Sequence, residues 1–383
     1  MKKILLNYYS RKNFGDDLFV ELFSKYFSEH KIYLLGNPFY VPVNRNNNVK
    51  VSLWSYVYTV LGKIQSLSKN KKWNRYCDSL TNKVLESAKK GKDANVLIGG
   101  SIFQEYKTDP VMEEIDFSVR QGRREFELDS YIQARKNTFV IGANLGPAYS
   151  EHYFDNMKAR LQHYAHIILR DYASYESVKE CGNVQYAPDV AFMYKPQTSV
   201  VKDTLVISIV KIENQTSNPK IIRAYYKLLE ESAKEFLAMG QKVSVLSFCK
   251  KEGDELAAWK LAKNFNGYDQ FELYSYDGNT SKIMEYFERA SMVIATRFHS
   301  MLMAFVHDVP VFPVVYHCKM KHYLHDIEFK GEYATLENLD MFDVTSMKNC
   351  YERGRNYNCD SHKEYAYLQF EILKRYLDGK KNE

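Results

Sequence analysis

The sequence predicts an α/β protein made of two doubly wound domains that face each other across a cleft. Short runs of apolar, often β-branched residues alternate with amphipathic stretches along the whole chain. These runs are continuously apolar, which is typical of strands that are buried on both faces of a parallel sheet. A polar stretch at residues 195–203 divides the series near the middle of the chain. Together these observations favour one parallel-sheet domain on each side of that stretch.

The predicted elements follow one another in a regular order. Strands are expected at residues 3–6, 32–35, 96–98, 138–141 and 167–169, and then at 205–210, 242–248, 292–295 and 311–315. Helices are expected at residues 18–27, 221–239 and 283–290, where apolar residues recur at helical spacing. We expect an N-terminal domain at 1–196, a C-terminal domain at 203–358, and a final segment at 359–383 whose helix packs back onto the first domain.

The composition is that of a globular protein and does not indicate a nucleic-acid partner. Hydrophobic residues make up 45% of the 383 positions, and a net charge of +6 is too small for a nucleic-acid binder. The most apolar stretch, at 293–315, contains Arg297, His307 and Asp308 and is too polar to span a bilayer. Six scattered cysteines and a polar start predict reduced thiols and a cytoplasmic location.

Two neighbouring aspartates follow the first predicted strand. Ligands of open α/β sheets bind at the carboxyl ends of the strands, so residues at these positions are candidates for chemistry. Gly15 permits a tight turn there, and Asp16 and Asp17 come next at the start of a helix. Capping of the helix explains one aspartate, and the second can accept a proton or bind sugar hydroxyls.

Glycine turns follow two further strands. Gly99 and Gly100 come after the strand at 96–98, and residues 142–147, which include Asn144, follow the strand at 138–141. Backbone N–H groups in such turns can face a ligand, whereas close packing of the backbone is the alternative explanation.

An arginine follows a strand in each half of the chain. Arg170 precedes Asp171 at a helix start, where it can bind phosphate or carboxylate, and a capped helix with a surface ion pair is the alternative. Arg297 and His299 follow the strand at 292–295 and offer a bidentate cation and a group that exchanges protons near neutral pH. A structural histidine in the core is the alternative for His299.

A zinc site is a competing interpretation of the segment after the last predicted strand. Cys318, His322 and His325 fall on one helical face, as zinc ligands do. Lys319 and Lys321 lie among them and disfavour a cation. We therefore predict neither a metal nor a cofactor.

The ordered set of motifs resembles the polysaccharide pyruvyl transferase family over about residues 4–325. The matching residues are Asn13, Gly15, Asp16, Asp17, Gly99, Gly100, Arg170, Asp171, Ser174, 187–189, 296–299, Pro310, 314–316 and Lys319. Phe298 stands where many members carry leucine. The resemblance implies two Rossmann-like halves, as in GT-B glycosyltransferases. It also implies that phosphoenolpyruvate donates pyruvate, as a ketal, to a sugar of a cell-surface glycan.

The resemblance also implies roles for single residues. The residues that would bind phosphoenolpyruvate are Arg170, Arg297, Phe298, His299 and Ser300. The residues that would contact the acceptor or form the loops around it are Gly15, Gly99, Gly100, Asn144, Asp189, Tyr316 and Lys319. We expect His299 to act as general acid or phosphate ligand, and Asp16 or Asp17 as general base.

Residues 51–76 depart from the pattern of a compact core. Apolar residues, among them Trp54 and Leu67, recur at helical spacing and lead into a basic cluster around Trp73. This pattern predicts an interfacial helix on an anionic membrane, and a core helix with a solvated basic end is the alternative. An interfacial helix would fit a lipid-linked oligosaccharide acceptor and a peripheral location at the inner face of the cell membrane.

Two other functions are compatible with the sequence. A GT-B glycosyltransferase that uses a nucleotide sugar in exopolysaccharide or capsule synthesis would share the fold and the phosphate site. We find no Glu-x7-Glu arrangement after a strand of the second half, which disfavours this function. A sugar-phosphate-binding protein would keep the cleft without turnover. The acceptor sugar and the oligomeric state do not follow from the sequence.

Overall fold

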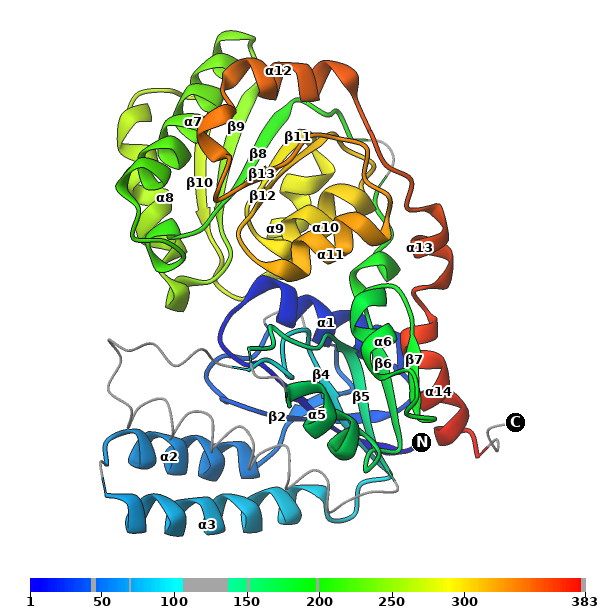
Figure 1. Cartoon of the computed structure of the whole chain (residues 1–383). Helices are drawn as coiled ribbons and strands as arrows, with labels where there is room; N and C mark the ends of the chain where they lie inside the picture. Colours follow the sequence, from blue (N-terminus) through cyan, green and yellow to red (C-terminus); the bar gives the residue numbers. More distant parts are fainter. Residues whose placement is uncertain (43–45, 69, 106–136, 150–151, 198–199, 380–383) are drawn as a thin grey trace.

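The computed structural model describes residues 1–42, 46–68, 70–105, 137–149, 152–197 and 200–379 (Figure 1). Each half of the chain is built around its own parallel sheet. The strand order is β3-β2-β1-β4-β5-β6-β7 in the first sheet and β10-β9-β8-β11-β12-β13 in the second. All described pairs of neighbouring strands are parallel. The prediction of two doubly wound domains is confirmed.

The elements have the following bounds. The first sheet consists of β1 (Lys3–Tyr8), β2 (Lys31–Leu35), β3 (Val49–Val51), β4 (Ala94–Ile98), β5 (Thr138–Ala143), β6 (His166–Leu169) and β7 (Val184–Tyr186). Its helices are α1 (Phe14–Tyr26), α2 (Trp54–Ser66), α3 (Lys71–Lys89), α5 (Tyr153–Leu161), α6 (Tyr172–Val178) and the short η1 (Val190–Met193).

The second domain has the same layered plan. Its strands are β8 (Thr204–Ile209), β9 (Lys242–Ser247), β10 (Phe271–Ser275), β11 (Ala290–Ala295), β12 (Val311–Val315) and β13 (Ala334–Thr335). Its helices are α7 (Pro219–Ala238), α8 (Asp254–Ala262), α9 (Thr280–Glu288), α10 (Phe298–Val306), α11 (Cys318–Asp326) and α12 (Val344–Arg353). The last element before the second sheet, η1, ends at Met193, and β8 begins at Thr204. Positions 198 and 199 of the expected linker fall outside the described residues.

Successive residues of the central strands pack against helices on opposite faces of each sheet. In β1, Ile4 belongs to the cluster under α1, whereas Leu5 packs with Leu85 of α3. In β8, Val206 packs in the same cluster as Ile4, whereas Leu205 packs on the opposite face of its sheet with side chains of α7. Coverage of both faces is why these strands read as continuous apolar runs.

One hydrophobic cluster continues from the first domain into the second. The rings of Phe14 and Phe248 lie 4.8 Å apart, and Phe14 also contacts Tyr276 at 5.9 Å between centroids. The backbone N–H of Phe14 donates to the carbonyl of Phe248 at 3.3 Å. The start of α1 is therefore anchored in the second domain, and Figure 1 shows α1 lying between the two sheets.

The C-terminal segment returns to the first domain as two helices, α13 (Asp360–Tyr365) and α14 (Leu368–Leu377). Figure 1 shows them in red, running from the second domain down beside the first. Gln369 accepts a hydrogen bond from the N–H of Gly142 at 2.9 Å and donates to the carbonyl of Ala187 at 2.8 Å. These bonds join α14 to the first sheet.

Residues 51–76 do not form the single helix that the sequence predicts. Val51 ends β3, and the segment then forms α2 and the first part of α3, which pack side by side as a hairpin (Figure 1). The break comes before Asn70, whose side chain caps α3 by accepting from the N–H of Lys72 at 2.9 Å. Most apolar side chains of α2 are exposed, and Tyr58 and Leu61 are partly buried, so α2 is not the core helix of the alternative. Within the described residues, no helix is both long and apolar enough to cross a membrane.

Candidate functional site

The first turns of three helices meet where the carboxyl ends of the two sheets face each other. His299, in the first turn of α10, lies directly against Gly15, in the first turn of α1. The side-chain nitrogen of Lys319, in the first turn of α11, lies 5.5 Å from the ring centre of Phe298. Helix N-termini carry partial positive charge and free N–H groups, so this arrangement favours an anion.

The guanidinium group of Arg170 is held by side chains of its own domain. It donates to Asp189 at 3.0 Å and to Asn144 at 2.7 Å, and it packs against Gly100, where a Cβ atom would collide with it. Phe298 of the other domain covers it, with the ring centre 4.4 Å from Cζ. Gly100 therefore makes room for Arg170, and Asp189 and Asn144 orient it.

Arg297 is held in the same way by the second domain. Its Nε donates to Asp254 at 2.8 Å, and its Nη1 pairs with Glu252. Burial opposes ionisation of Glu252, but Arg297 outweighs this effect and lowers the pKa of the Glu252 carboxyl. Tyr316 is half-buried beside Arg297; burial raises the pKa of the Tyr316 hydroxyl, and the charge of Arg297 opposes this effect. Both arginines thus enter the site with their charge balanced by carboxylates, and the partner of Arg170 is the buried Asp189 and not a surface group beside the helix cap.

The structure separates the two neighbouring aspartates. Asp16 is partly exposed, and burial raises the pKa of its carboxyl to about 7, against the opposing pull of Lys319 and Arg170. Asp17 is fully buried on the other side of the helix, where it accepts a hydrogen bond from Tyr276 at 2.7 Å. Burial also raises the pKa of Asp17 well above its ordinary value. Of the pair, Asp16 lies among the charged groups of the site, and Asp17 joins the domains.

His299 is surrounded by cations from both domains. Burial, followed by the positive charges of Arg170, Lys319 and Arg297, lowers the pKa of its imidazole well below the ordinary value. Its Nε2 is buried and has no hydrogen-bond partner among the described residues. Its ring packs edge-on against Phe19 at 5.4 Å between centroids. The free protein therefore holds a neutral imidazole in a positive environment.

Lys319 completes the cationic side of the site. Its Nζ donates to the hydroxyl of Ser101 at 3.4 Å, which links the second domain to the turn after β4. Burial, with Arg170 and Arg297 nearby, lowers the pKa of Lys319 to about 8. An amine with this pKa is protonated at neutral pH and can release its proton more readily than an exposed lysine.

The remaining predicted residues lie at or behind this centre. Gly99 adopts a φ of +147°, which favours glycine, and a Cβ atom there would lie 3.5 Å from the carboxylate of Asp16. The hydroxyl of Ser300 is fully buried within α10, without a hydrogen-bond partner in the described part of the chain. Ser300 therefore does not face the open side of the site.

The sequence did not single out Glu252 and Asp254, the two carboxylates that hold Arg297. Both follow β9, so the position rule that located the other candidates would also have found them. Tyr276, which follows β10 and bonds Asp17 beside the centre, was missed in the same way.

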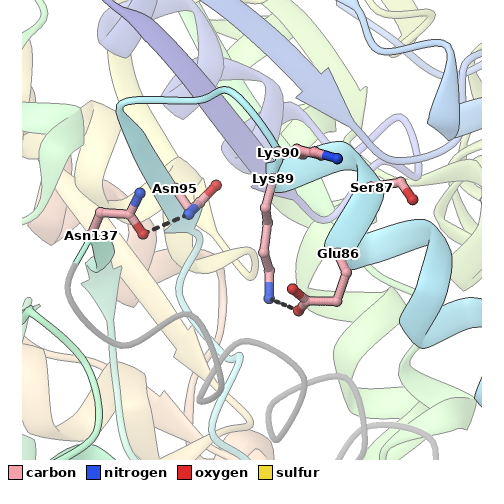
Figure 2. A pocket seen from close by; sticks show the side chains of 6 residues that line it. All are labelled: Glu86, Ser87, Lys89, Lys90, Asn95 and Asn137. Atoms are coloured by element: carbon pink, nitrogen blue, oxygen red, sulfur yellow. Dashed lines mark hydrogen bonds and ion pairs between the residues drawn. The ribbon is translucent and has the colours of Figure 1, made fainter.

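No three His, Cys, Asp or Glu side chains of the described residues are grouped so that they could hold a metal ion. Two cavities lie away from the centre. One, of about 790 Å³, lies between α6 and α11 and is lined by Tyr172, Tyr186 and Leu324 among others. Figure 2 shows the other, of about 440 Å³, at the amino ends of β4 and β5. Its Lys89 pairs with Glu86 at 3.0 Å.

Two parallel-sheet domains that meet at their carboxyl ends define a protein with the GT-B fold, and solved structures of this class are similar to the chain over nearly its whole length. A UDP-GlcNAc 2-epimerase from Neisseria meningitidis, bound to UDP-GlcNAc, has a TM-score of 0.58 and 10% identity over 98% of this chain and 100% of its own. The UDP-GlcNAc 2-epimerase of Methanocaldococcus jannaschii has a TM-score of 0.56 and 10% identity, over 97% of this chain and 99% of its own. TarM has a TM-score of 0.52 and 10% identity, over 99% of this chain and 98% of its own.

The family follows from the sequence itself. A model of the polysaccharide pyruvyl transferase family matches residues 13–317. The chain belongs to this family. A search of curated proteins found no match.

Proposed function

We propose that the protein transfers pyruvate from phosphoenolpyruvate, as a ketal, to a sugar of a cell-surface polysaccharide or of its lipid-linked precursor. The observation that carries this proposal is the neutral, unpaired Nε2 of His299 among Arg170, Arg297 and Lys319. Phosphoenolpyruvate bears a phosphate and a carboxylate, and a small polyanion is the ligand that these cations and helix N-termini would bind. Membership of the pyruvyl transferase family supports this choice of donor.

Asp16 is the general base in the proposed reaction. Because its pKa is about 7, a large fraction of the carboxyl is ionised at neutral pH and can take the proton of an acceptor hydroxyl. The hydroxyl oxygen then bonds to C2 of phosphoenolpyruvate. At the same time the methylene carbon C3 gains a proton and becomes a methyl group.

Lys319 donates the proton to C3, since its amine is protonated at neutral pH with a pKa of about 8. His299, which is neutral in the free protein, hydrogen-bonds the donor through Nε2. The bond from C2 to the phosphate oxygen then breaks, and its electron pair stays on phosphate. A second acceptor hydroxyl bonds to C2 and closes the ketal ring, and its proton leaves with phosphate. No cofactor is needed.

The reaction takes place, in this proposal, in the cytoplasm at the inner face of the cell membrane. We place the acceptor on a lipid carrier because the exposed apolar side chains of α2 support contact with a membrane. The acceptor is therefore a lipid-linked oligosaccharide in exopolysaccharide or capsule synthesis.

Two adjacent, isosteric substitutions test the assignment of the base. We expect Asp16→Asn to lower acceptor-dependent phosphate release from phosphoenolpyruvate by about 10²–10⁴-fold. Asp17→Asn is the matched control and should keep the wild-type rate, because Asp17 bonds Tyr276 away from the site. The acceptors would be a panel of synthetic glycans, and the ketal methyl group would be identified by NMR. Wild-type phosphate release by His299→Ala would remove His299 from the mechanism.

A glycosyltransferase that uses a nucleotide sugar is the second candidate, because the structural neighbours include proteins with bound UDP-GlcNAc. Thermal shift measurements separate the two. Stabilisation by phosphoenolpyruvate supports pyruvyl transfer, and stabilisation by UDP- or GDP-sugars alone supports glycosyl transfer. Binding of phosphoenolpyruvate without phosphate release on any acceptor would indicate a non-catalytic binding protein.

A further inference from the structure

The α2–α3 hairpin exposes a continuous apolar surface. Leu53, Val57, Val60, Ile64 and Leu67 are spaced three or four residues apart, which places them on one face of α2. Between 40% and 86% of each of these residues is exposed. We call these five residues the α2 stripe. Trp54, Tyr56, Trp73 and Tyr76 flank it and are also exposed.

The buried and exposed sides of α2 are reversed relative to an ordinary surface helix, because polar side chains face the body of the protein and apolar side chains face solvent. Its buried residues are polar: Ser55 donates to the carbonyl of Leu34 at 3.0 Å, and Gln65 contacts Asp78 of α3 at 2.5 Å. An amphipathic helix on a protein surface normally buries its apolar side. Here polar bonds attach the helix to the body and leave the apolar side to solvent, so the α2 stripe is available to a partner.

The charge around the α2 stripe identifies the partner. The sequence contains no Asp or Glu between Glu29 and Asp78. Lys63 on α2 and Lys72 at the start of α3 are exposed beside the stripe. Apolar side chains flanked by Trp, Tyr and Lys match the boundary between the acyl chains and the headgroups of an anionic bilayer. The carboxylate that α3 brings to α2, that of Asp78, is bonded to the buried Gln65. A second copy of the chain would bring the same positive charges against each other.

The stripe also connects to the candidate site. Phe39, in the loop after β2, is exposed and lies 6.3 Å from the ring centre of Tyr56. The ring centre of the next residue, Tyr40, lies 4.5 Å from the Nζ atom of Lys251. Lys251 precedes Glu252, the partner of Arg297. A short path along the surface therefore leads from the α2 stripe to the charged centre.

We propose that the α2 stripe inserts into the headgroup region of an anionic membrane and thereby holds the site near the bilayer surface. Membrane binding by the α2 stripe does not depend on the proposed function. Its role in presenting a lipid-linked acceptor to the site rests on the proposed function. Docking through Leu53, Val57, Val60, Ile64 and Leu67 requires no helix to cross the membrane.

Vesicle flotation with the full chain tests the proposal. Wild-type protein should float with phosphatidylcholine vesicles that contain phosphatidylglycerol, and float poorly without the anionic lipid or at high salt. Val57→Glu/Ile64→Glu should abolish flotation. Leu256→Glu is the matched control, because Leu256 is also exposed but lies on α8 of the other domain, and it should float like wild type. Lys63→Gln should lower the partition coefficient about fivefold.

Tryptophan fluorescence gives a second measurement. The chain has three tryptophans, so Trp259→Phe leaves only Trp54 and Trp73 as reporters. We expect their emission to shift to the blue when anionic vesicles are added, and the shift to disappear in Val57→Glu/Ile64→Glu. Circular dichroism would show that this double variant is folded, which its exposed positions favour.

Three outcomes would overturn the proposal. They are flotation of Val57→Glu/Ile64→Glu at the wild-type level, indifference to anionic lipid, and a dimer in light scattering that the double variant dissociates. In the last case a second copy covers the stripe. The double variant should keep wild-type phosphate release with a water-soluble acceptor. A chain that floats but never releases phosphate from phosphoenolpyruvate refutes the proposed function and leaves the membrane contact intact.

Discussion

His299 of the second domain rests on Gly15 of the first, and a single added carbon at position 15 would occupy the space of the imidazole. This contact places the start of α1 and the start of α10 against each other at the centre of the site. The absence of a side chain at Gly15 is therefore a requirement of the domain interface.

Gly15→Ala should destabilise the protein by about 1–3 kcal/mol, because the new methyl group overpacks the interface. The double variant Gly15→Ala/His299→Ala should recover most of this loss, since the smaller residue at 299 makes room. Urea denaturation of the four proteins in this cycle measures the coupling. Additive losses would show that the two residues do not touch in solution.

The pH dependence of kcat/KM should follow Asp16 and Lys319. Activity should rise as pH increases through about 7, where Asp16 loses its proton, and fall above about 8, where Lys319 loses its proton. Lys319→Arg should shift or remove the alkaline limb, because arginine does not titrate in this range. The profile is measured as acceptor-dependent phosphate release, and an unchanged alkaline limb in Lys319→Arg would exclude Lys319 as the acid.

Removal of the Tyr276 hydroxyl should affect stability and not chemistry. Tyr276→Phe leaves the buried carboxyl of Asp17 without its donor, which should cost about 1–3 kcal/mol in thermal or urea unfolding. The value of kcat should stay at the wild-type level. A large fall in kcat with unchanged stability would instead place Asp17 in the reaction.

Arg170→Lys should impair both stability and donor binding, although it keeps the charge. An ammonium group cannot reproduce the fork that bonds Asp189 and Asn144 while it lies flat on Phe298. We expect a loss of about 1–3 kcal/mol and an increase in KM for phosphoenolpyruvate. Arg223→Lys, at an exposed position of α7, is the control and should change neither. Unchanged KM in Arg170→Lys would contradict a role in donor binding.

The sequence predicted the interior of each sheet and missed its edges. All nine predicted strands are interior strands, whereas the missed strands β3, β7, β10 and β13 are the edges of the two sheets. Interior strands are covered on both faces and leave a continuous apolar run. Edge strands are partly exposed, and some are very short, as in the Val-Gln-Tyr of β7 and the two residues of β13.

The sequence predicted where the candidate site lies, but not which carboxylates pair with its two arginines. Strand ends located Asp16, Arg170, Arg297 and His299 in the sequence, and the family resemblance added Lys319. The sequence did not show which carboxylates pair with the two arginines, because the partners are distant in the chain: Asp189 lies 19 positions from Arg170, and Glu252 lies 45 positions from Arg297. Neighbouring residues of a helix point about 100° apart, so the sequence also could not say which of two adjacent aspartates enters the site.

The return of α14 has a consequence for synthesis on the ribosome. Phe370 packs on Phe23 at 5.4 Å, and Gln369 satisfies the backbone of β5, so the earliest part of the chain obtains these contacts from one of the latest. During synthesis, the surface of the N-terminal domain that α14 covers therefore stays exposed until the whole second domain has been translated. Nascent chains stalled before residue 368 should accordingly depend on chaperones and be cut readily by protease.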